Sequence, residues 1–115
     1  MLNLLKTAGE VADITSDIKR KSFMGAVAIR KDGVLVKSRN GLTIRPDCKS
    51  LSAHAEIRVL RKAGYGATVY VARVNKSGQF AMAKPCVYCM ASLRSRGVDM
   101  VYWTVSNNEW NGCKP

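Results

Sequence analysis

Residues 53–74 read AHAEIRVLRKAGYGATVYVARV and combine the signals of a helix and of a strand. Its first half suits a helix that Ser52 can cap and Gly64 can end, so we expect a helix from about Ala53 to Ala63. Its second half, Ala67 to Val74, alternates apolar and β-branched residues, which predicts a strand. The stretch is therefore a helix followed directly by a strand, an order typical of sheets with helices on their faces.

The same helix–strand order returns in residues 85–105, PCVYCMASLRSRGVDMVYWTV. Pro85 suits the first turn of a helix because its missing N–H is not needed there, and Gly97 suits the helix end. Val98 to Val105 should form the last strand. Right-handed crossover connections would place this strand parallel to the strand before it, in one sheet.

The N-terminal third adds a helix and a hairpin. Apolar residues recur every three or four positions from Leu4 to Ile18, which predicts one amphipathic helix. Two short apolar runs, Met24–Arg30 and Val34–Arg39, flank an Asp-Gly pair, which is a strong hairpin signal. The sequence thus predicts an α/β fold with a mixed sheet of about four strands, in a single domain over residues 1–115.

Composition favours a cytoplasmic protein with a basic surface. No apolar run approaches the roughly 18 residues that a membrane span requires, and Met1 to Lys6 does not resemble a secretory signal. Lysine and arginine outnumber the acidic residues 19 to 8, for a net charge of +11. This excess suits a phosphorylated or polyanionic partner, although basic residues spread over a chain also simply keep it soluble.

Three residues have the pattern of a catalytic zinc site, which uses three nitrogen or sulfur ligands and one open position. They are His54, the only histidine, and Cys86 and Cys89, which are three positions apart on one expected helix. Glu56 lies two residues after His54, where a carboxylate could move protons beside the metal. Taken singly, a lone histidine is more often structural, and a C-x-x-C pair also suits a redox or structural zinc site. Together the residues favour a catalytic metal.

His54-Ala55-Glu56 followed by Pro85-Cys86-Val87-Tyr88-Cys89 resembles the H-A-E and P-C-x-x-C signature of the cytidine deaminase-like zinc-dependent deaminases. The resemblance covers about Gly25 to Ser106. It implies a three-layer α-β-α sandwich, one Zn²⁺ per chain held by His54, Cys86 and Cys89, and Glu56 as the proton shuttle. It also implies an activated water that displaces ammonia from the ring, and a homo-oligomer.

The resemblance further indicates how a base would be held. The Ala55 amide would bind a ring oxygen, and Asn40, which precedes Gly41 as in deoxycytidylate deaminases, would bind the sugar unless it is an ordinary turn residue. We expect Trp110, in the polar tail after Ser106, to be an aromatic wall of the pocket. Basic residues on expected loops or strand ends could hold a phosphate: Arg45, Lys49, Arg73 and Lys84.

The chain departs from deoxycytidylate deaminases in its short loop from Leu42 to Ser52. Cys48 in that loop has no histidine partner for a second metal, so we expect one zinc, with Cys48 and Cys113 as free thiols.

Three functions remain open on the sequence. The first is conversion of cytosine to uracil on a nucleoside or nucleotide, supported by Asn40-Gly41. The second is deamination of cytosine or adenine in single-stranded DNA or RNA, supported by the net charge of +11. The third is a catalytically silent zinc-binding module, against which the intact Glu56 argues.

Overall fold

The computed structural model describes residues 2–11, 22–39, 59–60, 62–75 and 77–115. Residues 59–60 and 62–63 are helical. The other elements of this part of the chain are α1 (Leu2–Val11), β1 (Ser22–Ile29), β2 (Leu35–Arg39), β3 (Thr68–Asn75), β4 (Phe80–Ala81), α3 (Val87–Ser95), β5 (Met100–Ser106) and β6 (Glu109–Cys113). No helix among them combines the length and apolar character needed to cross a bilayer.

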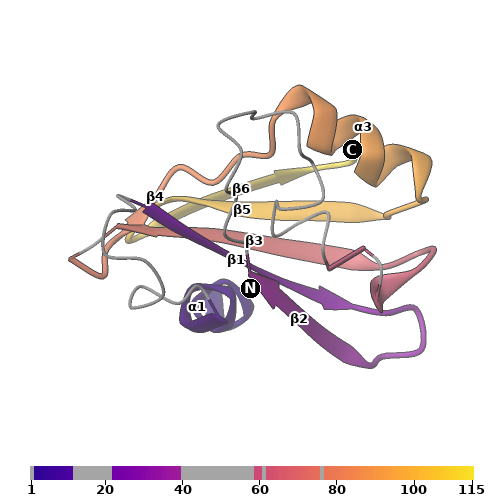
Figure 1. Ribbon diagram of the computed structural model, residues 1–115, viewed down its shortest axis with the longest axis horizontal. Helices are drawn as coiled ribbons and strands as arrows, with labels where there is room; N and C mark the ends of the chain where they lie inside the picture. The colour runs from indigo at the N-terminus through magenta and orange to yellow at the C-terminus, as the bar shows by residue number, and fades with distance from the viewer. Residues whose placement is uncertain (1, 12–21, 40–58, 61, 76) are drawn as a thin grey trace, which may run out of the picture.

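One mixed sheet organises the fold (Figure 1), in the order β2-β1-β3-β5-β6, with β4 paired to β3. β1 is antiparallel to both β2 and β3, whereas β3 and β5 are parallel, as predicted from their crossover connection. The α/β class and the mixed sheet are therefore confirmed. The sheet has six strands rather than about four, because β4 and the terminal β6 were not predicted.

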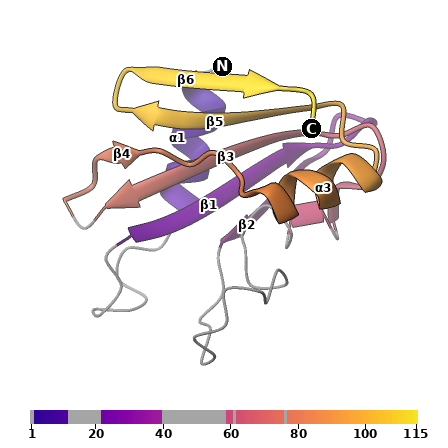
Figure 2. The ribbon, with the colours of Figure 1, turned by 90° about the horizontal axis from the view of Figure 1, so that it is seen from above.

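Helices cover both faces of the sheet, which confirms the three-layer sandwich. Figure 1 shows α1 on one face and α3 on the other, and Figure 2 shows α3 in front of the strands with α1 behind them. Ala8 of α1 packs on Val27 and Ala72, which belong to β1 and β3. The opposite cluster is larger, and its buried members are Ala26, Ala28, Val59, Leu60, Ala63, Ala67, Val69, Val71, Ala83, Leu93, Val98, Val101 and Trp103.

α3 begins and ends by identifiable backbone chemistry. Its N-cap is Cys86, in an extended conformation, so Pro85 lies just before the helix rather than in its first turn. At the other end, Gly97 N–H donates to the Arg94 carbonyl at 3.1 Å and Val98 N–H to the Leu93 carbonyl at 3.1 Å. These two bonds are those of a Schellman motif, with Gly97 at a φ of +74°. The predicted helix end is confirmed.

Replacing Gly97 by Ala should destabilise the fold. The substitution places a Cβ at a positive φ and against the ring of Tyr65. We expect a loss of at least about 1 kcal/mol in the free energy of unfolding, measured by urea denaturation. Gly33→Ala is the matched control, because its φ is also positive, at +89°, while nothing lies within 4 Å of the added Cβ. Equal losses in the two variants would show that the Tyr65 contact adds nothing.

The connection from β3 to α3 is fixed by the side chain of Thr104, which is only 2% exposed. Its hydroxyl accepts a hydrogen bond from Arg73 N–H at 3.3 Å and donates one to the Ala81 carbonyl at 2.7 Å. The Thr104 carbonyl in turn accepts from Ala83 N–H at 2.9 Å. This connection therefore runs between the ends of β3 and β5. Cys86, which follows it, lies at the carboxyl end of these two parallel strands.

Candidate active site

The N-terminal turn of α3 carries both cysteines of the predicted site. Cys86 is the exposed N-cap residue, and Cys89, one turn later, is completely buried. Met90 N–H donates to the Cys86 carbonyl at 2.9 Å, which closes the first turn of the helix. Unpaired backbone N–H groups and the helix dipole at such an end favour thiolates over thiols. The two sulfur atoms are therefore suited to bind a soft or borderline cation such as Zn²⁺.

The remaining predicted residues of this site lie outside the described residues: Asn40, His54, Ala55 and Glu56. Val59 and Leu60, which follow them, pack in the same cluster as Leu93 of α3. The segment that follows His54 and Glu56 thus lies on the same face of the sheet as the two cysteines. Within the described part of the chain, no group of three or more potential metal ligands is found.

Arg73, near the end of β3, lies on the sheet face that α3 covers. Its cross-strand neighbour on β1 is Met24, which packs against the larger core cluster, and the guanidinium lies 3.7 Å from the Met24 sulfur. The Nε of Arg73 is buried and has no hydrogen-bond acceptor. A thioether is only a weak acceptor, so neither Nε nor this terminal nitrogen has a strong acceptor among the described residues.

Lys84 lies on the same face, two residues before Cys86. Its Nζ sits 5.8 Å from the centre of the Trp103 ring, in a cation–π contact. Trp103 is paired with Val71 of β3, so it belongs to the same row of side chains as Arg73 two residues later. Two cations and an aromatic ring therefore accompany the cysteines at this end of the sheet.

Solved structures with the same architecture are cytidine deaminases. The enzyme from Mycobacterium leprae superposes with a TM-score of 0.59 at 18% identity, over 96% of this chain and 90% of its own. The Mycobacterium tuberculosis enzyme gives 0.57 at 21% identity, over 92% and 87%. The Burkholderia pseudomallei enzyme gives 0.61 at 15% identity, over 97% and 87%. No protein-family model and no curated protein gives a significant match to the sequence.

The chain has the cytidine deaminase-like fold. In this fold the cysteine pair lies at the N-terminus of α3, which packs on the mixed sheet.

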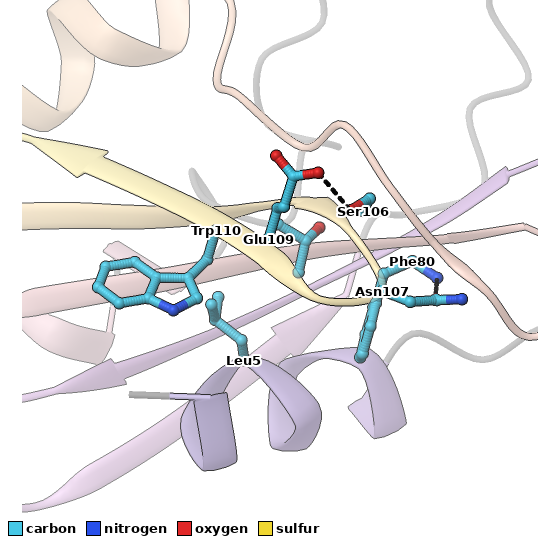
Figure 3. Close-up of a pocket in the computed structure, with 7 residues that line it drawn as sticks. Leu5, Phe80, Ser106, Asn107, Glu109 and Trp110 are labelled. Atoms are coloured by element: carbon cyan, nitrogen blue, oxygen red, sulfur yellow. Dashed lines mark hydrogen bonds between the residues drawn. The ribbon is translucent and has the colours of Figure 1, made fainter.

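Trp110 lies on the other face of the sheet from Cys86 and Cys89. It pairs with Thr104 across β5 and β6, and Figure 3 shows it beside Leu5 of α1, on the face opposite α3. A small recess there is lined by Leu5, Phe80, Thr104, Ser106, Asn107, Glu109 and Trp110. Trp110 therefore lies on the sheet face opposite α3, because it belongs to strand β6, which was not predicted; its role as a wall of a base pocket stays a prediction.

Trp110 ends a row of aromatic rings on the α1 face. Tyr70 and Tyr102 stack with ring centres 5.3 Å apart, and Trp110 meets Tyr102 edge-on at 5.9 Å. Burial, with a smaller contribution from the charge of Tyr102, raises the pKa of Tyr70 above its usual 10.0. This row packs strands β3, β5 and β6 together, which is a structural role.

Two further cysteines, Cys48 and Cys113, lie outside the C-x-x-C pair, and only Cys113 is among the described residues. Cys113, in β6, is a half-buried free thiol, as predicted. Cys48 lies outside the described residues, so its state stays a prediction.

Some contacts that shape this site could not be identified from the sequence. Thr104 gave no signal of its function, because a threonine in a strand is unremarkable until its hydroxyl partners are known. The contact of Lys84 with Trp103 depends on the path of the β3–α3 connection, which the unpredicted strand β4 determines.

Proposed function

We propose that this chain is a zinc-dependent hydrolytic deaminase that converts a cytosine base to uracil on a nucleoside or nucleotide. The observation that carries the proposal is the pair Cys86 and Cys89 on the first turn of α3, at the carboxyl ends of the parallel strands. Ligands of open α/β sheets bind at this edge. The shared fold with three cytidine deaminases supports the same conclusion.

The donor set fits Zn²⁺. Cys86 and Cys89 would hold the ion together with His54, which gives two thiolates, one imidazole and an open position. Zinc, when bound, would supply an activated water near neutral pH. The burial of Cys89 inside the fold means that metal binding and folding stability should be coupled.

The remaining chemistry falls to the protein's own residues. Glu56 would take a proton from the attacking water, pass it to the ring nitrogen and then deliver it to the leaving amine. Ala55 would orient the base through its backbone amide, and Asn40 would orient the sugar. Glu56 would move the proton, and Ala55 and Asn40 would hold the base and the sugar. All three would act on a substrate placed beside the metal that Cys86, Cys89 and His54 would hold.

The proposal includes a single domain, a homo-oligomer and a cytoplasmic protein. A reducing compartment suits it, because thiols that bind metal must stay reduced. The second candidate is a deaminase of cytosine or adenine in single-stranded DNA or RNA, favoured by the net charge of +11. A salt titration of oligonucleotide binding separates the two, since contacts to many phosphates give a steep dependence on salt.

A mass-spectrometric substrate panel tests the proposed function. Zinc-loaded protein is incubated with nucleosides, nucleotides and short single strands that contain cytosine or adenine. Replacing the amine by oxygen adds about one dalton, and we expect this gain on a cytosine nucleoside or nucleotide. The same protein after removal of zinc with a chelator is the control and should be inactive. Absence of the gain on every cytosine compound would show that the proposed reaction is wrong.

A further inference from the structure

Arg73 carries more hydrogen-bonding capacity than its surroundings use. Its Nε is buried without an acceptor, and its terminal nitrogen meets the sulfur of Met24 at 3.7 Å. A buried donor that lacks an acceptor costs free energy, and a guanidinium offers five donors in a fixed planar fork. Because Arg73 is only half-buried, a strong acceptor that approached its guanidinium would find donors not used by the described residues.

No carboxylate of the described residues neutralises this end of the sheet. The ion pair found in the described part of the chain joins Arg30 and Asp32 at 3.1 Å, at the opposite end of β1. Lys84 contacts the Trp103 ring rather than an acid. The two positive charges, Arg73 and Lys84, thus lie on the cysteine-bearing face without a negative partner among these residues.

The sheet topology places both cations beside the cysteine turn. Arg73 pairs with Ala81 of β4, three residues before Lys84, and Lys84 is two residues before Cys86. Lys84 reaches Trp103, whose partner Val71 precedes Arg73 by two positions on the same face of β3. Arg73 and Lys84 therefore lie on the sheet face that α3 covers, at the end of the sheet where the turn with Cys86 and Cys89 begins.

We infer that Arg73 and Lys84 form a phosphate subsite, and that the substrate is a cytosine nucleoside 5′-monophosphate rather than a bare nucleoside. The inference rests on the proposed function. A phosphate offers several acceptor oxygens, matches the planar fork of arginine and neutralises both cations.

A mononucleotide fits these observations better than a polynucleotide. Arg73 is half-buried in the sheet, so only part of its guanidinium can be reached by a ligand. Single-strand binders instead use exposed cations along an open groove, with aromatic platforms for successive bases. Trp103, the aromatic ring at this end, is buried in the core and contacts Lys84, so it offers no such platform.

Substrate preference tests the subsite. The ratio of kcat/KM for the 5′-monophosphate to kcat/KM for the matching nucleoside is measured for the wild type, Arg73→Gln, Arg73→Lys and Lys84→Gln. Arg73→Gln should lower this ratio about 10- to 100-fold, the loss expected for a hydrogen-bonded charge pair. Arg73→Lys keeps the charge but not the fork, and we expect a smaller decrease. Lys6→Gln, on the exposed side of α1, removes the same charge and should not change the ratio.

A binding measurement complements the kinetics. Inorganic phosphate, titrated by calorimetry, should bind the wild-type protein and should bind Arg73→Gln and Lys84→Gln about 10-fold more weakly or worse. Because Lys84 is exposed, its variant remains informative if Arg73→Gln fails to fold.

The outcomes separate the subsite from the proposed function. Deamination by the wild type with an unchanged ratio in Arg73→Gln and Lys84→Gln would overturn the subsite alone. A wild type that prefers short single strands over the monophosphate would also overturn it. No deamination of any cytosine compound would overturn the proposed function, and the substrate class with it.

Discussion

Replacing Glu56 by Gln should lower turnover of the cytosine substrate by at least about 10²-fold, the low end for loss of a general acid–base. Glutamine keeps the size and polarity of glutamate but cannot accept and return a proton. Because Glu56 is proposed as a shuttle and not a metal ligand, the variant should keep its zinc and its fold. Turnover, zinc content and the thermal midpoint are measured on the same preparation.

The control for Glu56→Gln is Glu10→Gln. Glu10 is an exposed residue of α1, on the opposite face of the sheet from the cysteines, and the substitution removes the same charge. It should leave turnover within about twofold of the wild type, as expected of a surface substitution. Near-normal turnover of Glu56→Gln, together with normal zinc content, would show that another group carries the proton.

Replacing Cys89 by Ser should remove the bound zinc and destabilise the protein. A serine hydroxyl is not ionised at neutral pH, so it does not replace a thiolate ligand. Since Cys89 is completely buried and metal binding is coupled to folding, we expect a loss of at least about 2 kcal/mol in the free energy of unfolding. Metal analysis gives the zinc content, and thermal unfolding with and without a chelator gives the coupling.

Cys113→Ser provides the matched control for Cys89→Ser. Cys113 is a half-buried free thiol in β6, and its substitution should leave the zinc content unchanged. The chelator should lower the thermal midpoint of the wild type and of Cys113→Ser, and should have no effect on Cys89→Ser. A Cys89→Ser protein that retains one zinc per chain would exclude Cys89 as a ligand.

The central part of the fold could be predicted because local chemistry specifies it. Asp32-Gly33 forms the predicted turn, in which Arg30 N–H donates to the Val34 carbonyl at 2.9 Å and Gly33 adopts a positive φ of 89°. Gly97 likewise ends α3 through a conformation that other residues adopt only with strain. In both places a single residue type identifies the backbone geometry.

Strands β4 and β6 could not be predicted because neither has a recognisable pattern of apolar residues. β6 is held by backbone pairing with β5, and most of its side chains are exposed, so no apolar alternation is present in its sequence. β4 has two residues, too few for any periodicity. Without β6, the face of the sheet to which Trp110 points could not be assigned from the sequence.

The candidate site also has one part that could be predicted from the sequence and one part that could not. The three-residue spacing of Cys86 and Cys89 is a property of helices, so their shared turn followed from the sequence. The surroundings of Arg73 instead depend on which strands lie on either side of β3, and that order is a tertiary property. Its unmatched Nε could be found only once Met24 and Ala81 were in place as neighbours.

The hydroxyl of Thr104 has a consequence for how the cysteine turn is held. It joins the backbone of Arg73 to that of Ala81, so the segment leading to the cysteine turn is held by bonds inside the sheet. None of those bonds uses a side chain proposed to touch the base or the sugar. We therefore expect a substitution of Lys84, proposed as a phosphate-binding residue, to leave Cys86 and Cys89 in place. A scaffold built in this way holds its cysteine turn independently of the residues proposed to select the substrate.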